Sequence, residues 1–331
     1  MTIETHAYAR AGLLGNPSDG YNGKTISIIV KNFAASVSLT ESAALKIVPH
    51  EQDLNEFKSM NDLVEKIALQ GYYGGERLIK AAIIKFHEFC FAIGHELEKR
   101  NFTIEYDSTI PRQIGLAGSS AIVTATMRAL KQFYKVSIPR HILPTLILNA
   151  ELEELGINAG LQDRVIQTYE GCVFMDFNKK IVEKNGYGFY EPLSRKLLPP
   201  LYIAYSTKLS KVSGRVLNDI RVKFDRGNKE VIDALSRIAD IAEQGKEVLK
   251  RGDSQMLHKL MNENFDLRCK IMNISDRNKE LVGTARACGA SAKFAGSGGS
   301  IIGTYKSEEM LNTLKKAMKK IDAEVIIPKV N

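Results

Sequence analysis

A stretch rich in glycine and serine lies between a predicted strand and a predicted helix, at residues 110–121 (IPRQIGLAGSSA). Small side chains let backbone N–H groups approach a phosphate chain closely, and the start of the following helix adds a partial positive charge. Ser119 and Ser120 can supply hydroxyl groups to phosphate oxygens or to a magnesium ion. The alternative is that these serines are ordinary helix-capping residues.

The phosphate-binding motifs of two common kinase classes are missing. No glycine–lysine pair has a glycine at the earlier position that a Walker loop requires. The signatures of protein kinases are also absent. If residues 110–121 bind phosphate, they do so by a different design.

Two further segments combine glycine with polar residues. Residues 293–300 (KFAGSGGS) lie between two predicted strands, where, taken alone, they could form a tight turn. Residues 160–164 (GLQDR) precede an apolar helix, whose N-terminus would keep Asp163 ionised. Taken alone, Asp163 could be a capping residue rather than a catalyst.

A cation and several polar groups occur close together near the N-terminus, at residues 10–19 (RAGLLGNPSD). Arg10 lies near one end of a predicted strand, and the loop after it carries Asn16 and Asp19. The segment can therefore present both charge and hydrogen-bonding groups to a ligand.

The cysteines and histidines indicate neither a metal site nor a nucleophilic triad. The 4 cysteines are scattered, with no pair at metal-ligand spacing, and the 6 histidines form no close ligand pair. Buried thiols that stay reduced inside a cell are the expected state of Cys90, Cys172, Cys269 and Cys288.

The bulk composition is that of a globular protein, with 44% hydrophobic and 25% charged residues. No run of about 18 apolar residues predicts a membrane span, and residues 1–10 lack the apolar core of a signal peptide, so a cytoplasmic location is expected. The net charge of +8 could serve nucleic acid or attract small anions. Because the basic residues are dispersed among acids, without interleaved aromatic residues, nucleic-acid binding is not expected.

Hydrophobic periodicity predicts strands and helices that alternate in an α+β pattern. Strands are expected at residues 26–30, 35–39, 102–106, 171–175, 188–190, 201–206, 291–295, 300–305 and 323–327. Lys31 and Asn32 are predicted to form a turn between the first two. Helices are expected at 60–70, 75–99, 119–134, 141–154, from about 160, in several long segments up to about 288, and at 307–320. The double proline in residues 197–200 (LLPP) predicts a domain boundary.

Together these segments resemble the GHMP kinases, the family that joins galactokinase, homoserine kinase, mevalonate kinase and phosphomevalonate kinase. Three motifs fall in the family's order across nearly the whole chain, which is more specific than any one of them. Within the family the likeness is strongest to the glucuronokinases, which phosphorylate the anomeric hydroxyl of D-glucuronic acid. The stretches that carry it are residues 10–19, 71–75, 110–121, 160–164 and 264–268.

The resemblance implies the fold and the cofactors. Residues 1–198 would form an N-terminal domain like domain 2 of ribosomal protein S5, and residues 199–331 a ferredoxin-like C-terminal domain. ATP would lie with its phosphates over Pro111, Gly115, Leu116, Ala117, Gly118, Ser119, Ser120 and Ala121. Mg²⁺ would be held by Ser120 and Glu151, although Glu151 could also be a solvated acid beside Glu153 and Glu154.

The resemblance also implies catalytic and substrate-binding residues. Asp163 would remove or orient the proton of the acceptor hydroxyl, and Arg10 would stabilise charge on the oxygen. The sugar would contact Asn16, Asp19, Tyr72, Tyr73, Arg268, Gly296, Ser297, Gly298 and Gly299. A uronic acid needs a partner for its carboxylate, and an arginine is the natural choice. Arg268 is predicted to be this arginine, and Arg112 and Arg164 are the alternatives. Arg268 could instead be a surface cation on a helix.

Two departures and three alternatives remain. Tyr8 and Ala9 stand where the family often has a proline–glycine pair, and Pro17 or Ser18 replaces a histidine common in galactokinases. The enzyme could be another sugar 1-kinase, acting on galactose or a heptose phosphate, or a mevalonate- or homoserine-type kinase. It could also be a non-catalytic nucleic-acid-binding module. The sequence is silent on the oligomeric state.

Overall fold

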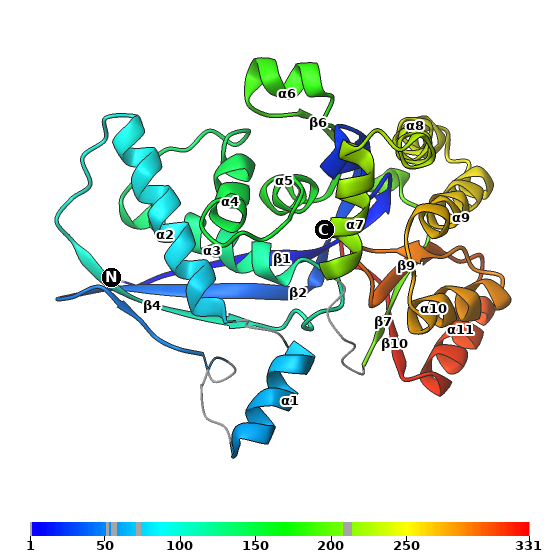
Figure 1. Cartoon of the computed structure of the whole chain (residues 1–331), viewed down its shortest axis with the longest axis horizontal. Coiled ribbons are helices and arrows are strands. Elements are labelled where there is room, and N and C mark those ends of the chain that lie inside the picture. The colour runs from blue at the N-terminus through cyan, green and yellow to red at the C-terminus, as the bar shows by residue number, and fades with distance from the viewer. Residues whose placement is uncertain (1, 51–52, 54–57, 71–73, 208–213, 331) are drawn as a thin grey trace. The chain divides into compact units, whose positions relative to one another are not determined.

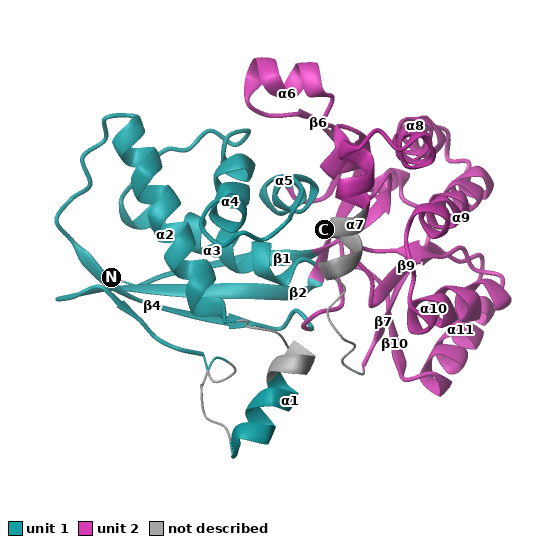
Figure 2. Cartoon of the chain, in the orientation of Figure 1, with its two compact units in different colours: residues 1–9, 32–111, 117–169 teal, residues 10–31, 112–116, 170–331 magenta. Residues whose placement is uncertain are grey.

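The computed structural model describes residues 2–50, 53, 58–70, 74–207 and 214–330. Contacts group the chain into two compact units (Figure 2). Unit 1 comprises residues 1–9, 32–111 and 117–169, and unit 2 comprises residues 10–31, 112–116 and 170–331. Two long strands, β1 (Thr2–Leu14) and β2 (Lys24–Ser42), run through both units.

Unit 1 combines strands with a layer of helices. In this unit β2 pairs antiparallel with β4 (Asn101–Ser108), which pairs in parallel with β3 (Lys46–Ile47). The helices α2 (Gly75–Ala92), α3 (Gly118–Phe133), α4 (Leu143–Leu152) and α5 (Gln162–Tyr169) pack on one another on one side of the strands (Figure 1). The remaining helix of the unit is α1 (Met60–Gln70).

The apolar periodicity that predicted these helices faces the core of unit 1. In α3 the buried positions include Ala121, Ala125 and Phe133. Phe133 meets Phe102 of β4 edge-on, with the ring centroids 5.4 Å apart. The buried aromatic pair fixes the helix on the sheet, because such pairs add to the gain from burial alone.

Unit 2 contains a four-stranded antiparallel sheet in the order β10-β7-β9-β8. Its strands are β7 (Leu201–Ser206), β8 (Lys293–Phe294), β9 (Ser300–Thr304) and β10 (Ala323–Ile326). Helices separate β7 from β8, and one helix separates β9 from β10. That succession is the β-α-β-β-α-β pattern of the ferredoxin-like fold, so the expected class of this region is confirmed.

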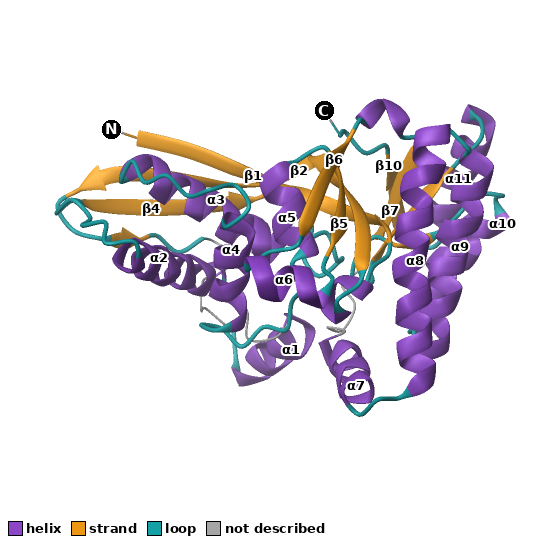
Figure 3. Cartoon of the chain, turned by 90° about the horizontal axis from the view of Figure 1, so that it is seen from above, coloured by secondary structure: helices purple, strands orange, loops and turns teal. Residues whose placement is uncertain are grey.

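The longer helices of unit 2 include α7 (Gly214–Asp225), α8 (Lys229–Arg251), α9 (Ser254–Ile271), α10 (Asp276–Ala287) and α11 (Glu308–Lys320). α8 and α9 run side by side (Figure 3). Polar caps set their starts: the side chains of Asn228, Asp253 and Ser307 accept hydrogen bonds from first-turn N–H groups of α8, α9 and α11. The apolar faces bury a core that includes Tyr202, Phe265 and Phe294.

Shorter elements complete unit 2. β5 (Cys172–Asp176) pairs with residues 24–28 of β2 and with β6 (Phe189–Leu193). Two short 3₁₀ helices lie at Ser18–Tyr21 and Arg195–Leu197. α6 (Lys179–Asn185), between β5 and β6, was not predicted from the sequence.

The predicted turn at Lys31 and Asn32 is wrong, because both residues lie inside the continuous strand β2. Strand geometry is tolerated there because the polar groups have partners. The N–H of Lys31 donates to the carbonyl of Lys329 at 2.8 Å, and its ammonium lies 3.3 Å from Glu170. Pairing on both sides, with β5 along residues 24–28 and with β4 along residues 35–42, keeps the strand continuous.

The helix predicted at residues 75–99 is too long, since α2 ends at Ala92. Gly94 adopts φ +68°, a left-handed conformation that ends a helix and that glycine accepts without strain. The strand predicted at 291–295 is also reduced, to Lys293–Phe294. The α+β class itself is confirmed, whereas the domain boundary at residues 198 and 199 stays a prediction. Among the described residues, none of the helices combines the length and the apolar character that a membrane span needs.

Candidate active site

The glycine–serine stretch leads into α3 by an unusual cap. Ala117 is the N-cap residue in a left-handed conformation (φ 63°, ψ 45°), and no side chain caps the helix there. Ser119 and Ser120 lie in the first turn of the helix, so their interpretation as capping residues is wrong. A helix start whose cap residue offers no acceptor side chain suits an anion, because the first-turn N–H groups and the helix dipole both favour negative charge.

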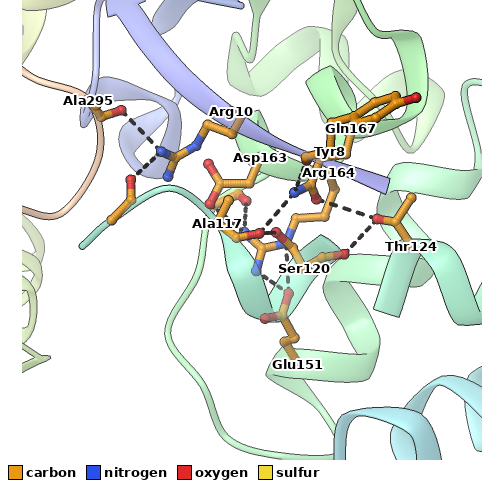
Figure 4. A network of polar contacts seen from close by, with 12 residues as sticks. Tyr8, Arg10, Ala117, Ser120, Thr124, Glu151, Asp163, Arg164, Gln167 and Ala295 are labelled. Carbon is orange, nitrogen blue, oxygen red and sulfur yellow. Dashed lines mark hydrogen bonds and ion pairs between the residues drawn. The ribbon is translucent and has the colours of Figure 1, made fainter. Parts of the chain in front are cut away.

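The corner at Ala117 is held by buried polar side chains (Figure 4). Gln167 of α5, which is fully buried, donates from Nε2 to the carbonyl of Ala117 at 2.9 Å and to that of Tyr8 at 3.1 Å. The hydroxyl of Ser120 donates to the same Ala117 carbonyl at 3.2 Å, and Thr124 donates to the carbonyl of Ser120 at 2.7 Å. These bonds fix the direction in which the start of α3 points.

A buried ion pair joins α4 to α5. Glu151 is 1% exposed and Arg164 is 4% exposed, and Arg164 donates from Nε and Nη2 to Oε2 of Glu151 (Figure 4). Burial raises the pKa of Glu151, and the charge of Arg164 opposes this. The alternative of a solvated acid is wrong for Glu151. The neighbouring acids Glu153 and Glu154 are the more exposed ones, and they pair with Lys85.

The residues predicted to hold Mg²⁺ fit a cation that takes most of its ligands from phosphate and water. Both hydrogen bonds from Arg164 end on Oε2, so Oε1 of Glu151 is the oxygen that suits a metal. No group of three or more histidine, cysteine or acidic side chains that could hold a metal occurs among the described residues. A magnesium ion needs only one or two protein oxygens when it binds a nucleotide, so the pair Ser120 and Glu151 is adequate in kind.

Asp163 is the second residue of α5, in its first turn. Its side chain is 19% exposed, and a carboxylate oxygen lies 3.4 Å from Nη1 of Arg164. That nitrogen also donates to the carbonyl of Gly160 at 2.9 Å. The helix N-terminus and the guanidinium both favour the carboxylate form, which can accept a hydrogen bond or a proton.

Arg10 lies in unit 2 and is 5% exposed. Its Nη1 donates to the carbonyl of Gly115 at 2.6 Å and to that of Ala295 at 3.1 Å (Figure 4). The carbonyl of Leu116 accepts from the backbone N–H of Arg10 at 3.2 Å. Arg10 therefore ties residues 112–116 to the glycine cluster of residues 293–300.

The two glycine segments of unit 2 meet backbone to backbone. A Cβ atom added to Gly296 would lie 2.1 Å from the carbonyl oxygen of Gly115. One added to Gly115, which has φ +69°, would lie 2.7 Å from the carbonyl oxygen of Gly298. Ser300 donates from its hydroxyl to the carbonyl of Ile114 at 2.6 Å. Residues 293–300 are thus more than a tight turn, because they pack against residues 112–116.

The polar loop after β1 is tied to buried lysine and asparagine side chains. Asn16 is 3% exposed, its Oδ1 accepts from Lys293, and its backbone carbonyl accepts from Asn264 at 3.1 Å. Asp19 lies in the 3₁₀ helix Ser18–Tyr21 and is partly exposed. The role of Asn16 and Asp19 in binding a sugar stays a prediction.

Arg268, on α9, is 1% exposed, so its interpretation as a surface cation is wrong. It donates from Nη1 to the carbonyl of Gly296 at 3.0 Å and lies over the ring of Phe294 at 4.9 Å. Arg164, the alternative candidate for binding the carboxylate, forms the buried ion pair with Glu151. Arg112 is partly exposed.

The other predicted site residues fall in different surroundings. Tyr72 and Tyr73 lie outside the described residues. Pro111, Gly118 and Ser119 are partly exposed, Leu116 and Ala121 are buried, and in residues 296–299 only Ser297 is exposed. Sequence reasoning missed the roles of Gln167 and Lys293. Gln167 carries no signal, because a glutamine in a helix is usually solvated, whereas Lys293 stands in a motif that was recognised only for its glycines.

Two family models match the chain. Residues 77–171 match the family described as GHMP kinases N terminal domain, and residues 246–322 match GHMP kinases C terminal. Two relatives from Arabidopsis thaliana are similar along most of their length. Probable glucuronokinase 2 is 46% identical over 307 residues, covering 91% of this chain and 83% of its own, and Glucuronokinase 1 is 43% identical over 309 residues, covering 91% and 84%.

Solved structures of low sequence identity share the fold. The galactokinase of Lactococcus lactis, complexed with galactose, superposes with a TM-score of 0.78 at 16% identity, covering 99% of this chain and 93% of its own. The mevalonate kinase of Methanococcus jannaschii superposes with a TM-score of 0.72 at 23% identity, covering 100% and 98%.

Proposed function

This chain belongs to the GHMP kinases, and on that premise we propose that it transfers the γ-phosphoryl group of ATP to the anomeric hydroxyl of D-glucuronic acid. The observation that carries the proposal is the identity of 46% and 43% with two glucuronokinases over 91% of the chain. The product is glucuronic acid 1-phosphate. The 4 free cysteines suit a reducing compartment, and we assign the reaction to the cytoplasm.

The start of α3 is the proposed seat of the triphosphate. Phosphoryl transfer asks the protein mainly for positioning and for neutralisation of charge. Backbone N–H groups at Gly118 and Ser119, with the dipole of a 16-residue helix behind them, supply both. The buried amide of Gln167 keeps the Ala117 corner in place, so the N–H groups do not have to reorganise when ATP binds.

Ser120 and Glu151 are the proposed protein ligands of Mg²⁺. The ion, when bound, neutralises phosphate charge that develops during transfer. Arg164 holds Glu151 through Oε2 and thereby orients Oε1. A magnesium ion bound next to Glu151 would also favour the ionised form of its carboxylate, whereas burial favours the protonated form.

Asp163 is proposed to accept a hydrogen bond from the anomeric hydroxyl and to take its proton as the phosphoryl group arrives. An anomeric hydroxyl is more acidic than an ordinary alcohol, so even a weakly basic carboxylate suffices. Arg10 would stabilise negative charge on the attacking oxygen. Its carbonyl partners at Gly115 and Ala295 fix the guanidinium before the substrate binds.

The direct test follows ATP consumption by the purified protein with Mg²⁺ and a panel of acceptors: glucuronate, galacturonate, glucose, galactose, a heptose phosphate, mevalonate and homoserine. We expect turnover with glucuronate, and a fall in kcat of about 100-fold or more in Asp163→Asn, as for the loss of a general base. Turnover confined to galactose or a heptose phosphate would support the kinase assignment but refute glucuronate as the acceptor.

The nucleic-acid-binding alternative predicts a different result. A protein of that kind would be retained on heparin with a steep dependence on salt and would consume no ATP with any acceptor. That pair of outcomes would refute the kinase itself.

A further inference from the structure

Three cationic side chains of unit 2 are buried within electrostatic reach of one another. Arg10, Arg268 and Lys293 are 5%, 1% and 0% exposed. Lys293 is surrounded by neutral acceptors: its ammonium donates to the carbonyls of Gly12 at 2.6 Å and Phe294 at 2.8 Å, and to the side-chain oxygen of Asn16. These oxygens satisfy its three protons without supplying a counter-charge.

Arg268 differs from Lys293 because part of its hydrogen-bonding capacity is unused. Nη1 donates to the carbonyl of Gly296, but Nε and Nη2 are buried and have no hydrogen-bond partner in the part of the chain that the structure describes. Nε and Nη2 lie on the same edge of the guanidinium. That edge presents two parallel N–H groups at the spacing of the two oxygens of a carboxylate.

Leaving such an edge empty is unfavourable. A buried N–H group without a partner loses its hydration and gains nothing in return, and the loss is larger for a charged group. Burial lowers the pKa of Arg268 to about 10, and that of Lys293 is also lowered by burial and by the charges of Arg268 and Arg10. One added anion would compensate this cluster of positive charge.

The position of Arg268 connects the empty edge to the sugar-binding segments. The carbonyl that it bonds belongs to Gly296, which packs on Gly115. The charge of Asp19, the acid proposed to bind ring hydroxyls, acts on Arg268. We propose that the Nε–Nη2 edge of Arg268 binds the carboxylate of the acidic sugar side-on and thereby selects uronic acids over neutral sugars. This inference rests on the proposed function for the identity of the anion.

The sugar carboxylate can reach the Nε–Nη2 edge of Arg268 only after a local rearrangement of the protein. Because Arg268 is 1% exposed, the carboxylate reaches it only when its surroundings shift. Residues 296–299 are the part of those surroundings that bonds Arg268, and Ser297 among them is exposed. Binding of the uronate therefore requires these residues to shift.

The kinetic test compares Arg268→Met, which keeps the bulk of the side chain but removes the fork, with the wild type. We expect kcat/KM for glucuronate to fall by about 100-fold, mainly through KM, because two charge-assisted hydrogen bonds are lost. We expect kcat/KM for glucose to change by less than about 3-fold, because glucose has no carboxylate. Arg268→Lys keeps the positive charge but loses the two parallel N–H groups, so its kcat/KM for glucuronate should lie between those of the wild type and Arg268→Met.

The matched control is Arg237→Gln. Arg237 lies on α8 with its side chain 36% exposed and pairs with Glu263 of α9. The substitution therefore removes a guanidinium from a neighbouring helix and leaves the three buried cations unchanged. Its kcat/KM for glucuronate should equal that of the wild type. An equal loss in both variants, or an equal loss for glucuronate and glucose in Arg268→Met, would show a structural role and refute the proposal.

A binding test needs no variant and no turnover. The melting temperature of the wild type is measured with glucuronate, with its neutral amide glucuronamide, and with inorganic phosphate. We expect glucuronate to stabilise the protein more than the other two. Equal stabilisation by glucuronate and glucuronamide would refute the proposal, and so would stabilisation by phosphate alone, which would assign the edge to a phosphoryl group.

These measurements separate this inference from the proposed function. Stabilisation by glucuronate over glucuronamide, without turnover of glucuronate, would keep the carboxylate subsite and refute glucuronate as the acceptor of the phosphoryl group. A kcat/KM for glucuronate that is unchanged in Arg268→Met would keep the kinase assignment and refute the subsite.

Discussion

At the scale of single residues, the pair formed by Glu151 and Arg164 would have two functions, as a buried ion pair and, under the proposed function, as part of a Mg²⁺ site. As a buried ion pair it must stay complete, because removing one partner leaves the other charge without compensation. As a metal site it needs an oxygen turned away from the arginine. Both functions are compatible because Arg164 donates both of its hydrogen bonds with Glu151 to Oε2, so that Oε1 remains for the proposed ion.

We predict that Glu151→Gln weakens the response to Mg²⁺. Glutamine keeps the shape and an acceptor for Arg164 but removes the negative charge that binds the ion. The concentration of Mg²⁺ for half-maximal activity should rise about 10-fold or more, as for the loss of an interaction that tunes a metal site. A titration of activity with Mg²⁺ at saturating ATP measures this. Glu153→Gln, which changes an exposed acid nearby, should titrate like the wild type, and a rise in both would contradict the assignment.

At the scale of elements, Lys85 ties α2 to the end of α4. It is 8% exposed, and its ammonium lies 2.8 Å from Glu88, 2.7 Å from Glu153 and 2.8 Å from Glu154. The hydrogen bonds that Lys85 donates to Glu153, Glu154 and Glu88 raise its pKa above the usual value.

We predict that Lys85→Met lowers the free energy of unfolding by about 1 kcal/mol, because three carboxylates lose their common partner. Since the folded pKa of Lys85 is raised, its contribution is fully present below the pKa of the unfolded lysine, about 10.4, and is lost only as the pH rises through the folded value. Urea unfolding should show the same difference at pH 6 and pH 9. The difference should shrink in 1 M NaCl. A difference that grew with salt would contradict an electrostatic origin.

The contact between residues 112–116 and 293–300 makes a second prediction at this scale. Gly296→Ala places a Cβ 2.1 Å from the carbonyl oxygen of Gly115, a backbone atom that cannot turn away. The variant should lose about 1–3 kcal/mol of stability and most of its activity. Urea unfolding and the ATP assay measure the two losses.

Gly283→Ala is the matched control, because the same substitution on α10 meets no atom within 4 Å. Replacing a helix-interior glycine by alanine there should stabilise the protein by about 0.5–1 kcal/mol and leave its activity unchanged. Equal effects at the two glycines would mean that the packing of the two glycine segments does not matter.

At the scale of the whole molecule, the protein has a net charge of +8, whereas the proposed substrate is an anion. A positive protein raises the local concentration of negative ligands, and salt screens the attraction. We predict that kcat/KM for glucuronate at saturating ATP falls about 3-fold or more as NaCl rises from about 0.02 M to about 0.5 M. Steady-state rates at several salt concentrations measure this. The kcat should stay constant, and a kcat/KM independent of salt would exclude a role for the net charge.

Much of the architecture was predictable because it depends on local patterns. The helices α3 and α4 and the strand β7 were placed within two residues of their observed bounds, since apolar periodicity and turn residues define them. The prediction failed where a long-range contact decided the outcome. Pairing with β4 and β5 on either side kept β2 continuous through a polar dipeptide that resembles a turn.

By itself the sequence determined the family and the α+β class, and it supplied the segments of the proposed site, because motifs such as residues 110–121 are contiguous in the chain. Only the tertiary structure decided which of those residues are buried and with whom they pair. Lys293 donates to Gly12, 281 residues away in the chain, and Nε and Nη2 of Arg268 have no hydrogen-bond partner among the residues that the structure describes. The physical reason is that burial and charge compensation are properties of the folded neighbourhood, to which segments distant in the chain contribute.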